Sequence, residues 1–569
     1  MKYKCLVRFR SLSVPQSSTD CKEHIIPEAP EEPPKTPGVP IPNCRVSLTV
    51  PILYMATAAT SSSPDISTLG GLRASGYVHR TVKEEMRANL MKKLQTGEPL
   101  FPGVLGYDRT VLPQLENAIL SQHDIILLGL RGQAKSRIVR MLPRFLNEWI
   151  PILKDTPLNE HPYNPLTKQG RELVEEYGDE APIDWLHRSA RYGEKLATPD
   201  TTIADLIGDI DPIKAANLRL TYADEEIIHF GIIPRTNRGI FAINELPDLQ
   251  PRIQVGLLNI MEEQDIQIRG FNVRFPLDVM LVFSANPEDY TSRGNLITPL
   301  KDRIDSQIIT HYPKTTEVGM AITEQEAWQD RSDEDGERVD VQIPYIFREV
   351  IEQVAFEARD SEYIDQKSGV SVRVTRAALE LLISAAERRA LVNGEDETVV
   401  RVSDLLHLAP AITGKVELVY EGEQEGAENV AYTLIGRALR TVFTQYFPDP
   451  SDKEGGREAY ADVLAWFTQG NTVNLNQDLS DDTYRTRLSK IEGLAELVTS
   501  ESTPDTDAQR FVMMEMVLEA LHQNSLLGKE MRDDGQSYSD IMGSMLSSFG
   551  NGFDEDDFDD DDFDVDDFR

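Results

Sequence analysis

The segment over residues 129–136, GLRGQAKS, has the residue types and the spacing of a phosphate-binding loop. It fits the pattern G-x-x-x-x-[G/A]-K-[S/T], with Ala134 at a position where glycine is usual. In such a loop the backbone N–H groups wrap the β-phosphate of a nucleotide, and the next helix presents its positive end to it. The pattern predicts that Lys135 reaches the β- and γ-phosphates of ATP and that Ser136 binds Mg²⁺. The residues that we expect to contact the nucleotide are Gly129, Arg131, Gly132, Gln133, Ala134, Lys135 and Ser136.

The residues around this loop argue against a plain glycine-rich turn with a solvated lysine. An apolar run over 124–128 predicts a buried strand directly before the loop, and apolar residues at helical spacing (Ile138, Val139, Leu142) follow it. A phosphate loop requires this order of strand, loop and helix.

Two side chains after the apolar run 239–243 have the chemistry to assist a metal ion and to activate water. ATPases of this type usually end that strand with two carboxylates, the first near Mg²⁺ and the second polarising the attacking water. Here the first position is Asn244, which can accept a hydrogen bond from metal-bound water but carries no charge, so we expect weaker Mg²⁺ binding. Glu245 keeps the carboxylate of the base. The alternative is that Glu245 is a surface carboxylate after a core strand.

A third apolar run, over 278–284, ends just before Asn286. Ligands of open parallel sheets bind at the carboxyl ends of the strands, so we expect Asn286 beside the γ-phosphate, where its amide orients water together with Glu245. Taken alone, the Asn-Pro pair at this point is also typical of an ordinary turn.

The order and spacing of these motifs resemble the AAA+ ATPases of the MoxR and magnesium-chelatase ATPase-subunit (ChlI-like) group. The Ala-Lys-Ser form of the loop is similar to MoxR-type loops, and residues 203–215 (IADLIGDIDPIKA) and 230–289 are similar to the chelatase subunit. The resemblance covers residues 100–310 well and the region to 414 loosely, and it covers neither end. It implies a P-loop NTPase core with a helical lid.

The resemblance also implies roles for a hairpin and for several arginines. Residues 266–276 resemble a β-hairpin that faces the ring pore, and the segment TPLKDRID makes Arg303 the candidate arginine finger, with Arg293 as a weaker second candidate. An arginine finger stabilises charge that develops on the γ-phosphate of a neighbouring subunit. In the lid, SVRVTRAALE resembles the second sensor, with Arg373 as its arginine and Arg376 as an open alternative. For each arginine a surface salt bridge is the other interpretation.

Two positions depart from the pattern of the group. Arg131 stands where proline is frequent, and Asn244 replaces aspartate. We still expect hydrolysis, because the other predicted site residues are present, but we expect it to be slow.

The elements that must position these residues form an α/β fold with a parallel sheet, because short apolar runs alternate with longer helical patterns from Arg80 to about Pro313. We expect an amphipathic helix ending near Gly97. The predicted organisation is a disordered leader over 1–80, an AAA+ nucleotide-binding domain over 81–315, a helical lid over 316–414, a further helical region over 415–550 and a disordered acidic tail over 551–569. Residues 1–54 are either part of that leader or an over-extended reading frame that precedes a start at Met55.

Composition narrows the class of protein. The chain has 569 residues and a net charge of -37, which disfavours non-specific nucleic-acid binding because the phosphate backbone repels it. Its three cysteines all lie in the first 44 residues, and no run of about 18 apolar residues occurs, so we expect a cytoplasmic protein without a membrane span. Residues 553–569 hold eleven acidic residues and four phenylalanines, which indicate either a solvated tail or a docking motif.

Three functional hypotheses follow. The first is a ring-forming ATPase, expected to be a hexamer, that remodels or activates a partner with a von Willebrand A domain; that domain would be encoded separately, since no D-x-S-x-S motif occurs here. The second is the motor of a metal-tetrapyrrole chelatase, and the third is a nucleotide-gated scaffold that does not hydrolyse ATP. A sigma-54-type activator is disfavoured because its G-A-F-T-G-A loop is missing from the sequence.

Overall fold

The structure is a computed structural model that describes residues 62–218, 225–268, 274–287, 296–331, 339–452, 456–504, 506–532 and 535–541. All of these residues lie in the unit Ser61–Arg569, and everything below concerns them. The predictions made for residues 1–54, for the acidic tail, for Arg293 and for the tip of the 266–276 hairpin fall outside the described residues.

A five-stranded parallel sheet forms the centre of the N-terminal part, in the order β11-β1-β10-β7-β4. The three strands expected from the apolar runs are confirmed as β1, β7 and β10. Because neighbouring strands run in the same direction, their carboxyl ends lie at one edge of the sheet. The bounds are β1 Ile125–Leu128, β4 Tyr192–Leu196, β7 Gly239–Asn244, β10 Val279–Ala285 and β11 Ser306–Ile309.

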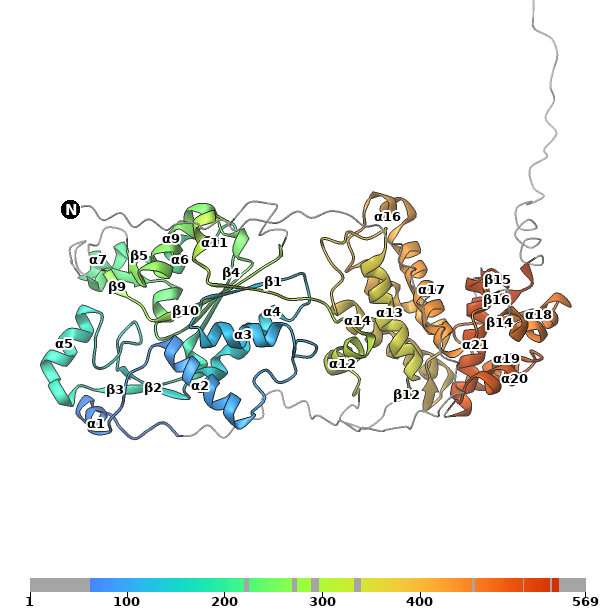
Figure 1. The fold of residues 1–569 in the computed structure, drawn as a ribbon, viewed down its shortest axis with the longest axis horizontal. Helices are drawn as coiled ribbons and strands as arrows, with labels where there is room; N and C mark the ends of the chain where they lie inside the picture. The colour runs from blue at the N-terminus through green and yellow to red at the C-terminus, as the bar shows by residue number, and fades with distance from the viewer. Residues whose placement is uncertain are drawn as a thin grey trace, which may run out of the picture. The chain divides into compact units, whose positions relative to one another are not determined.

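Successive side chains of a strand point to opposite faces of the sheet, and here both faces are covered by helices. Ile125 and Leu127 pack into one core with α2 (Val82–Thr96), α3 (Val111–Leu120) and α4 (Lys135–Met141). Ile126 and Leu128 pack into the other with α6 (Ile203–Leu206), α9 (Pro251–Glu262) and α11 (Thr298–Arg303). Figure 1 shows these two groups of helices on opposite sides of the sheet. This arrangement confirms the predicted α/β class.

The predicted helix before Gly97 is confirmed as α2. Thr81 and Glu84 form a reciprocal capping box at its start, and Gly97 ends it with a φ of 70°. The prediction of a disordered leader over residues 1–80, in contrast, is wrong for its last part, which contains a helix. Leu69 and Leu72 are fully buried in α1 (Leu69–Ala74), and these buried apolar side chains keep this turn in place.

The C-terminal part is mostly helical, and its lid and later helices share one hydrophobic core that runs from Ala327 to Tyr538. The expected boundary at 414 therefore does not divide this part into two separate hydrophobic cores. An antiparallel sheet of three strands, which the sequence patterns did not predict, joins the expected helices. The elements are α12 Thr316–Glu326, α13 Tyr345–Asp360, α14 Arg373–Asn393, α15 Ala409–Thr413, α16 Tyr420–Glu425, α17 Ala427–Tyr446, α18 Ala461–Thr468, α19 Asp481–Leu488, α20 Leu494–Glu501, α21 Asp507–Gln523, β14 Val473–Leu475, β15 Gly528–Arg532 and β16 Gly535–Ser539.

Shorter pieces complete the two parts. They are β2 Trp149–Leu153, α5 Lys168–Tyr177, β3 Ile183–His187, β5 Gly208–Ile210, α7 Pro212–Leu218, β6 Ile228–Phe230, α8 Ile232–Arg235, β8 Asp265–Gln267, β9 Arg274–Pro276, β12 Asp340–Gln342 and β13 Glu397–Val399.

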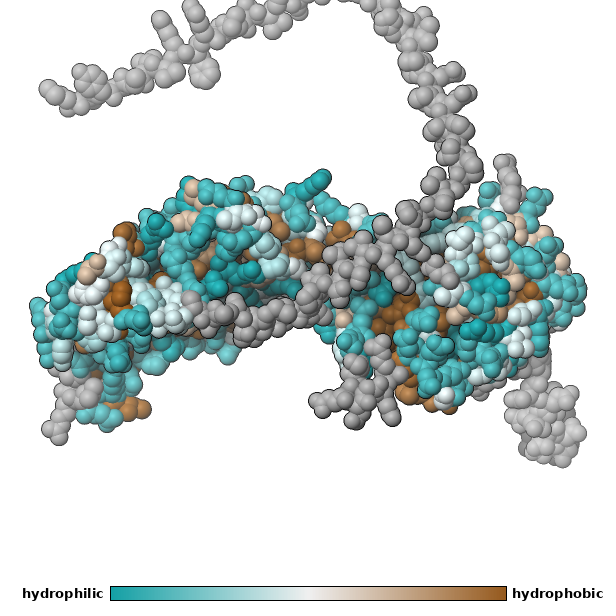
Figure 2. Space-filling model, turned by 90° about the horizontal axis from the view of Figure 1, so that it is seen from below, coloured by the Kyte–Doolittle hydropathy of each residue, from teal (hydrophilic) through white to brown (hydrophobic). Residues whose placement is uncertain are grey.

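The described surface is that of a strongly charged chain. The face in Figure 2 is mostly hydrophilic, with apolar residues in small groups. Among the helices that the structure describes, none combines the length and the apolar character needed to cross a bilayer.

Candidate functional site

The phosphate loop leaves the end of β1 and enters α4, as the sequence predicts. Gly132 and Ala134 adopt left-handed conformations, with φ of 73° and 55°, so the backbone curls before the helix begins. Gly129 has no room for a side chain, because a Cβ there would lie 1.8 Å from Thr310 Oγ1. The same hydroxyl donates to the buried Gln133 Oε1 at 2.6 Å and anchors the outer side of the loop to the end of β11.

The ammonium group of Lys135 lies between the start of this loop and Asn286. It donates to the carbonyl of Gly129 and to Asn286 Oδ1, the latter at 3.0 Å. Lys135 and Asn286 follow neighbouring strands, β1 and β10, so the parallel sheet brings them together across 151 positions of sequence. Ser136, in the first turn of α4, has an exposed side chain.

Glu245 follows β7 with φ 53° and ψ 48°, a left-handed conformation that is rare for residues other than glycine. Its backbone N–H donates a long hydrogen bond of 3.4 Å to Ser284 Oγ. Such backbone strain, of order 1–3 kcal/mol, is concentrated at functional sites, where it directs a side chain away from the regular course of the strand.

Asn244 is held by a polar network that sequence analysis did not anticipate. Its Oδ1 accepts a hydrogen bond from Ser284 Oγ at 3.0 Å, and its Nδ2 donates to Glu194 Oε1 at 2.6 Å. The guanidinium of Arg140 donates two hydrogen bonds to the same carboxylate, of 2.9 and 3.0 Å. Partial burial raises the pKa of Glu194, but Arg140 and hydrogen bonds from Tyr192 and Asn244 outweigh this effect, so the pKa lies below its usual value.

Glu194 gave no sequence signal because its strand, YGEKL, lacks an apolar run. The strand β4 lies at the edge of the sheet and is only partly buried, so it tolerates polar residues.

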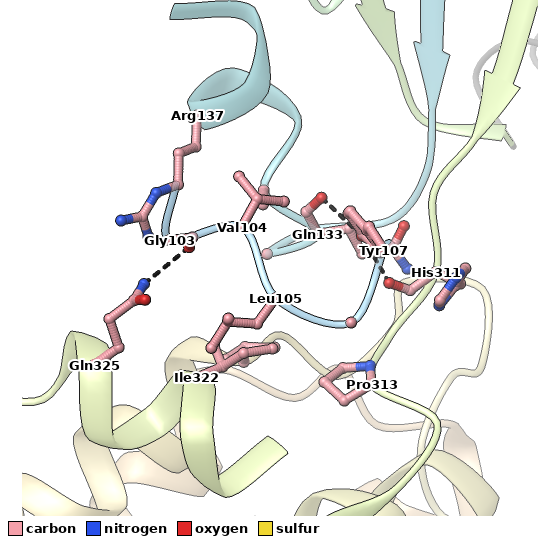
Figure 3. Close-up of a pocket in the computed structure, with 14 residues that line it drawn as sticks. Gly103, Val104, Leu105, Tyr107, Gln133, Arg137, His311, Pro313, Ile322 and Gln325 are labelled. Atoms are coloured by element: carbon pink, nitrogen blue, oxygen red, sulfur yellow. Dashed lines mark hydrogen bonds between the residues drawn. The ribbon is translucent and has the colours of Figure 1, made fainter. Parts of the chain in front are cut away.

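A cavity of about 60 Å³ opens beside the loop (Figure 3). One wall is the segment 103–107, in which Gly103 and Gly106 have φ of 75° and 79°. Burial raises the pKa of Tyr107 to about 12, so its hydroxyl stays protonated, and it lies 3.0 Å from the Gln133 carbonyl. Segment 103–107 was not predicted to belong to the site, although two glycines in FPGVLGYD were a signal for a tight loop. The lining residues are Gly103, Val104, Leu105, Gly106, Tyr107, Gly132, Gln133, Ala134, Arg137, His311, Pro313, Ile322, Gln325 and Val372.

The lid contacts the loop directly. The side chain of Arg131 donates to both the carbonyl and the hydroxyl of Ser368, and it pairs with Glu417 at 3.0 Å. Gly132 lies so close to the start of α14 that a Cβ would be 2.1 Å from Ser371 Oγ. Arg131, expected to contact nucleotide, therefore has its side chain directed to the lid.

The predicted arginines lie at other points of the surface. Arg303 donates hydrogen bonds to Glu262 of α9, from Nε at 2.9 Å, and to the carbonyl of Pro299 in its own helix. Arg373 is exposed at the first position of α14, next to Val372 of the cavity wall. Arg376 donates to Glu380 at 3.0 Å, within the same helix. The strands β8 and β9 form an antiparallel pair over the base of the expected hairpin.

The oxygen donors at this edge of the sheet suit Mg²⁺. This ion prefers oxygen ligands, keeps several waters and is completed by substrate phosphates, so it needs only one or two protein groups. Ser136, Asn244 and Glu245 supply a hydroxyl, an amide oxygen and a carboxylate. Within the described ranges, no three His, Cys, Asp or Glu side chains cluster as a complete metal cage.

No family model matches the chain. It is 27% identical to magnesium-chelatase subunit ChlI of Nephroselmis olivacea over 251 residues, 42% of this chain and 65% of that protein. It is 25% identical to the ChlI subunit of Cyanophora paradoxa over 328 residues, 54% of this chain and 88% of that protein.

A solved structure of NtrX from Brucella abortus superposes with a TM-score of 0.32 at 13% identity, covering 70% of this chain and 72% of that one. The fold assignment rests on the strand order and on the phosphate loop described above. Together with the ChlI alignments, they show an α/β chain with a phosphate loop that is a distant homologue of the proteins named magnesium-chelatase subunit ChlI.

Proposed function

We propose that the chain is an AAA+ motor that binds and hydrolyses ATP with Mg²⁺ and uses the energy to remodel or activate a partner protein. The observation that carries the proposal is the position of Lys135, whose ammonium joins the phosphate loop to Asn286 at the carboxyl ends of β1 and β10. A triphosphate at this point would be bound by the backbone amides of residues 129–134 and by Lys135.

Each predicted side chain takes one part in this proposal. Bound Mg²⁺ would neutralise phosphate charge, and Ser136 and Asn244 would hold it and its water shell. Glu245 would take the proton of the attacking water, and Asn286 would orient that water. Arg303 would act on the site of a neighbouring subunit, and Arg373 would contact the nucleotide of its own chain from the lid. Because Asn244 brings no charge, turnover would be slow.

The chain would work as a ring, and we propose a hexamer that acts on a separate protein with a von Willebrand A domain. The hydrogen bonds of Arg303 go to Glu262 and Pro299, which leaves its role as a finger for a neighbouring subunit to the proposed ring.

Phosphate release in the steady state tests the proposal, with Lys135→Ala and Glu245→Gln as matched variants. We expect wild-type turnover above both, lost nucleotide binding in Lys135→Ala, and retained binding without turnover in Glu245→Gln. Wild-type release equal to that of both variants, with and without partner, would refute hydrolysis. Calorimetry then separates a non-hydrolysing scaffold, which takes up ATP, from a chain that binds no nucleotide.

A second candidate is the motor of a metal-tetrapyrrole chelatase, which the alignments with magnesium-chelatase subunit ChlI favour. Deletion of the gene should then lower the metallated tetrapyrrole and raise the metal-free one. Unchanged pigment levels in the deletion strain would exclude this candidate.

A further inference from the structure

We propose that Glu194 is a positioning residue of the Mg²⁺-nucleotide site, and that its carboxylate, partly neutralised by Arg140, supplies part of the negative charge that position 244 lacks. Its side chain is 22% exposed, and Oε1 lies 2.6 Å from Asn244 Nδ2. The inference rests on the function proposed above, because only a bound metal gives this charge a role in nucleotide chemistry.

The orientation of the Asn244 amide follows from its two neighbours. A carboxylate accepts hydrogen bonds only, so the amide nitrogen must face Glu194. The amide oxygen then faces Ser284, whose hydroxyl donates to it at 3.0 Å. Since Ser284 Oγ also lies near the backbone N–H of Glu245, Glu194 indirectly positions the residue proposed as the base.

The same contacts explain why an amide stands at position 244. An aspartate there would place a carboxylate oxygen where Nδ2 now lies, at hydrogen-bond distance from Glu194 Oε1. Two like charges at such a distance repel each other strongly in a partly buried site. Asn244 and Glu194 therefore form a matched pair: one carboxylate and one amide fit, and two carboxylates do not.

Arg140 also holds the Glu194 carboxylate in place, so its position does not depend on the residue at 244 alone. Its two hydrogen bonds fix both oxygens of Glu194, while its own side chain is 64% exposed. Groups behind the direct ligands of a metal site commonly change metal affinity 10–100-fold, so a charge held in this way is sufficient to matter.

A cycle of four proteins tests the pairing: wild type, Asn244→Asp, Glu194→Gln and the double variant. The first measurement is the thermal midpoint of the full chain in EDTA without nucleotide. We expect Asn244→Asp to lower it by at least about 2 °C, and the double variant to recover most of that loss. Asn117→Asp, at an exposed position of α3, is the control for an added charge and should leave the midpoint unchanged.

The second measurement is the Mg²⁺ concentration that gives half-maximal ATP binding. Glu194→Gln should raise it roughly ten-fold, and the double variant, which returns the charge at position 244, should bring it back to the wild-type value or below. A purely structural role for Glu194 would leave this concentration unchanged.

The outcomes separate the two proposals. If Asn244→Asp is as stable as wild type, or if the double variant is no more stable than Asn244→Asp, the pairing is refuted whether or not ATP is hydrolysed. If Asn244→Asp does not fold, folding of the double variant supports the pairing and its failure to fold refutes it. If the stability cycle holds but no variant binds ATP, the proposed function falls and Glu194 has no part in metal binding.

Discussion

At the residue scale, the phosphate loop contains two left-handed positions, and only one of them is a glycine. Ala134 adopts φ 55° although its Cβ disfavours this region by roughly 1–2 kcal/mol. The loop holds it there through its neighbour Gln133, which is buried and bonded to Thr310. Strain of this kind indicates a backbone shape that the rest of the site imposes.

We therefore expect Ala134→Gly to leave the free energy of unfolding unchanged or to raise it by up to about 1 kcal/mol. Ala385→Gly, the same exchange inside α14, should lower it by about 1 kcal/mol because glycine weakens a helix interior. Urea denaturation of both variants compares the two directly. Equal losses in both would show that the left-handed backbone at Ala134 carries no strain.

At the element scale, three lid helices meet at one buried carboxylate. Glu352 of α13 is 2% exposed and accepts a hydrogen bond from Thr323 of α12, beside Thr375 of α14. Burial raises its pKa from 4.5 to about 6, even though Thr323 and Arg359 act in the opposite direction. The folded lid therefore prefers the protonated carboxyl.

The sign of the resulting pH dependence follows from this shift. The pKa of Glu352 is higher in the folded protein than in the unfolded chain. Its contribution to the free energy of unfolding is therefore fully present below about pH 4.5 and is lost as the pH rises through about 6. The loss amounts to roughly 2 kcal/mol. Glu352→Gln removes the titration and can still accept the hydrogen bond from Thr323. We expect the thermal midpoint of the variant, relative to wild type, to rise between pH 4.5 and pH 7. A difference that stays constant over that range would contradict this.

Elements with strong local patterns could be predicted from sequence, and elements defined by their surroundings could not. The strands β1, β7 and β10 are buried on both faces, so they are continuous apolar runs, and α2 carries its own capping residues. The strand β4 is polar because it lies at an edge, and segment 103–107 joins the site only through folding. The expected site residues Lys135 and Asn286 do meet, whereas the partner of Asn244 and the direction of the Arg131 side chain depend on contacts that no local pattern encodes.

At the scale of the whole molecule, the proposed ring makes each site depend on two chains. Lys135→Ala removes the cation of one subunit's own loop, and Arg303→Ala removes the finger offered to a neighbour. Each variant alone should be inactive, but an Arg303→Ala subunit whose neighbour is Lys135→Ala has both parts intact.

Mixing the two variants in equal amounts should therefore restore hydrolysis to about a quarter of the wild-type rate, the fraction of complete interfaces in a randomly mixed ring. Phosphate release by the reassembled mixture measures this. If both components are inactive and the mixture is inactive too, Arg303 serves its own chain; if Arg303→Ala alone is as active as wild type, Arg303 has no role in hydrolysis. The Arg303–Glu262 ion pair must open for the finger to act, so Glu262→Gln should not reduce turnover.

The contact between Arg131 and the lid predicts an effect on nucleotide exchange. Arg131→Ala removes the bonds to Ser368 and Glu417, so we expect bound ADP to be released faster, as followed by displacement of a fluorescent analogue in a stopped-flow instrument. Arg388→Ala breaks the exposed pair with Asp478, away from the loop, and should not alter the release rate. Equal rates for all three proteins would contradict the expectation.

The tight approach of Gly132 to Ser371 extends this point to how a client protein could control the chain. A Cβ does not fit between Gly132 and Ser371, so a shift of the segment before α14 toward the loop would displace the loop peptide. The helix α14 shares one hydrophobic core with the helices up to α21, so a partner that rearranges this core would act on the same segment. Under the proposed function, a partner protein that moves these helices would thereby change how the loop binds nucleotide.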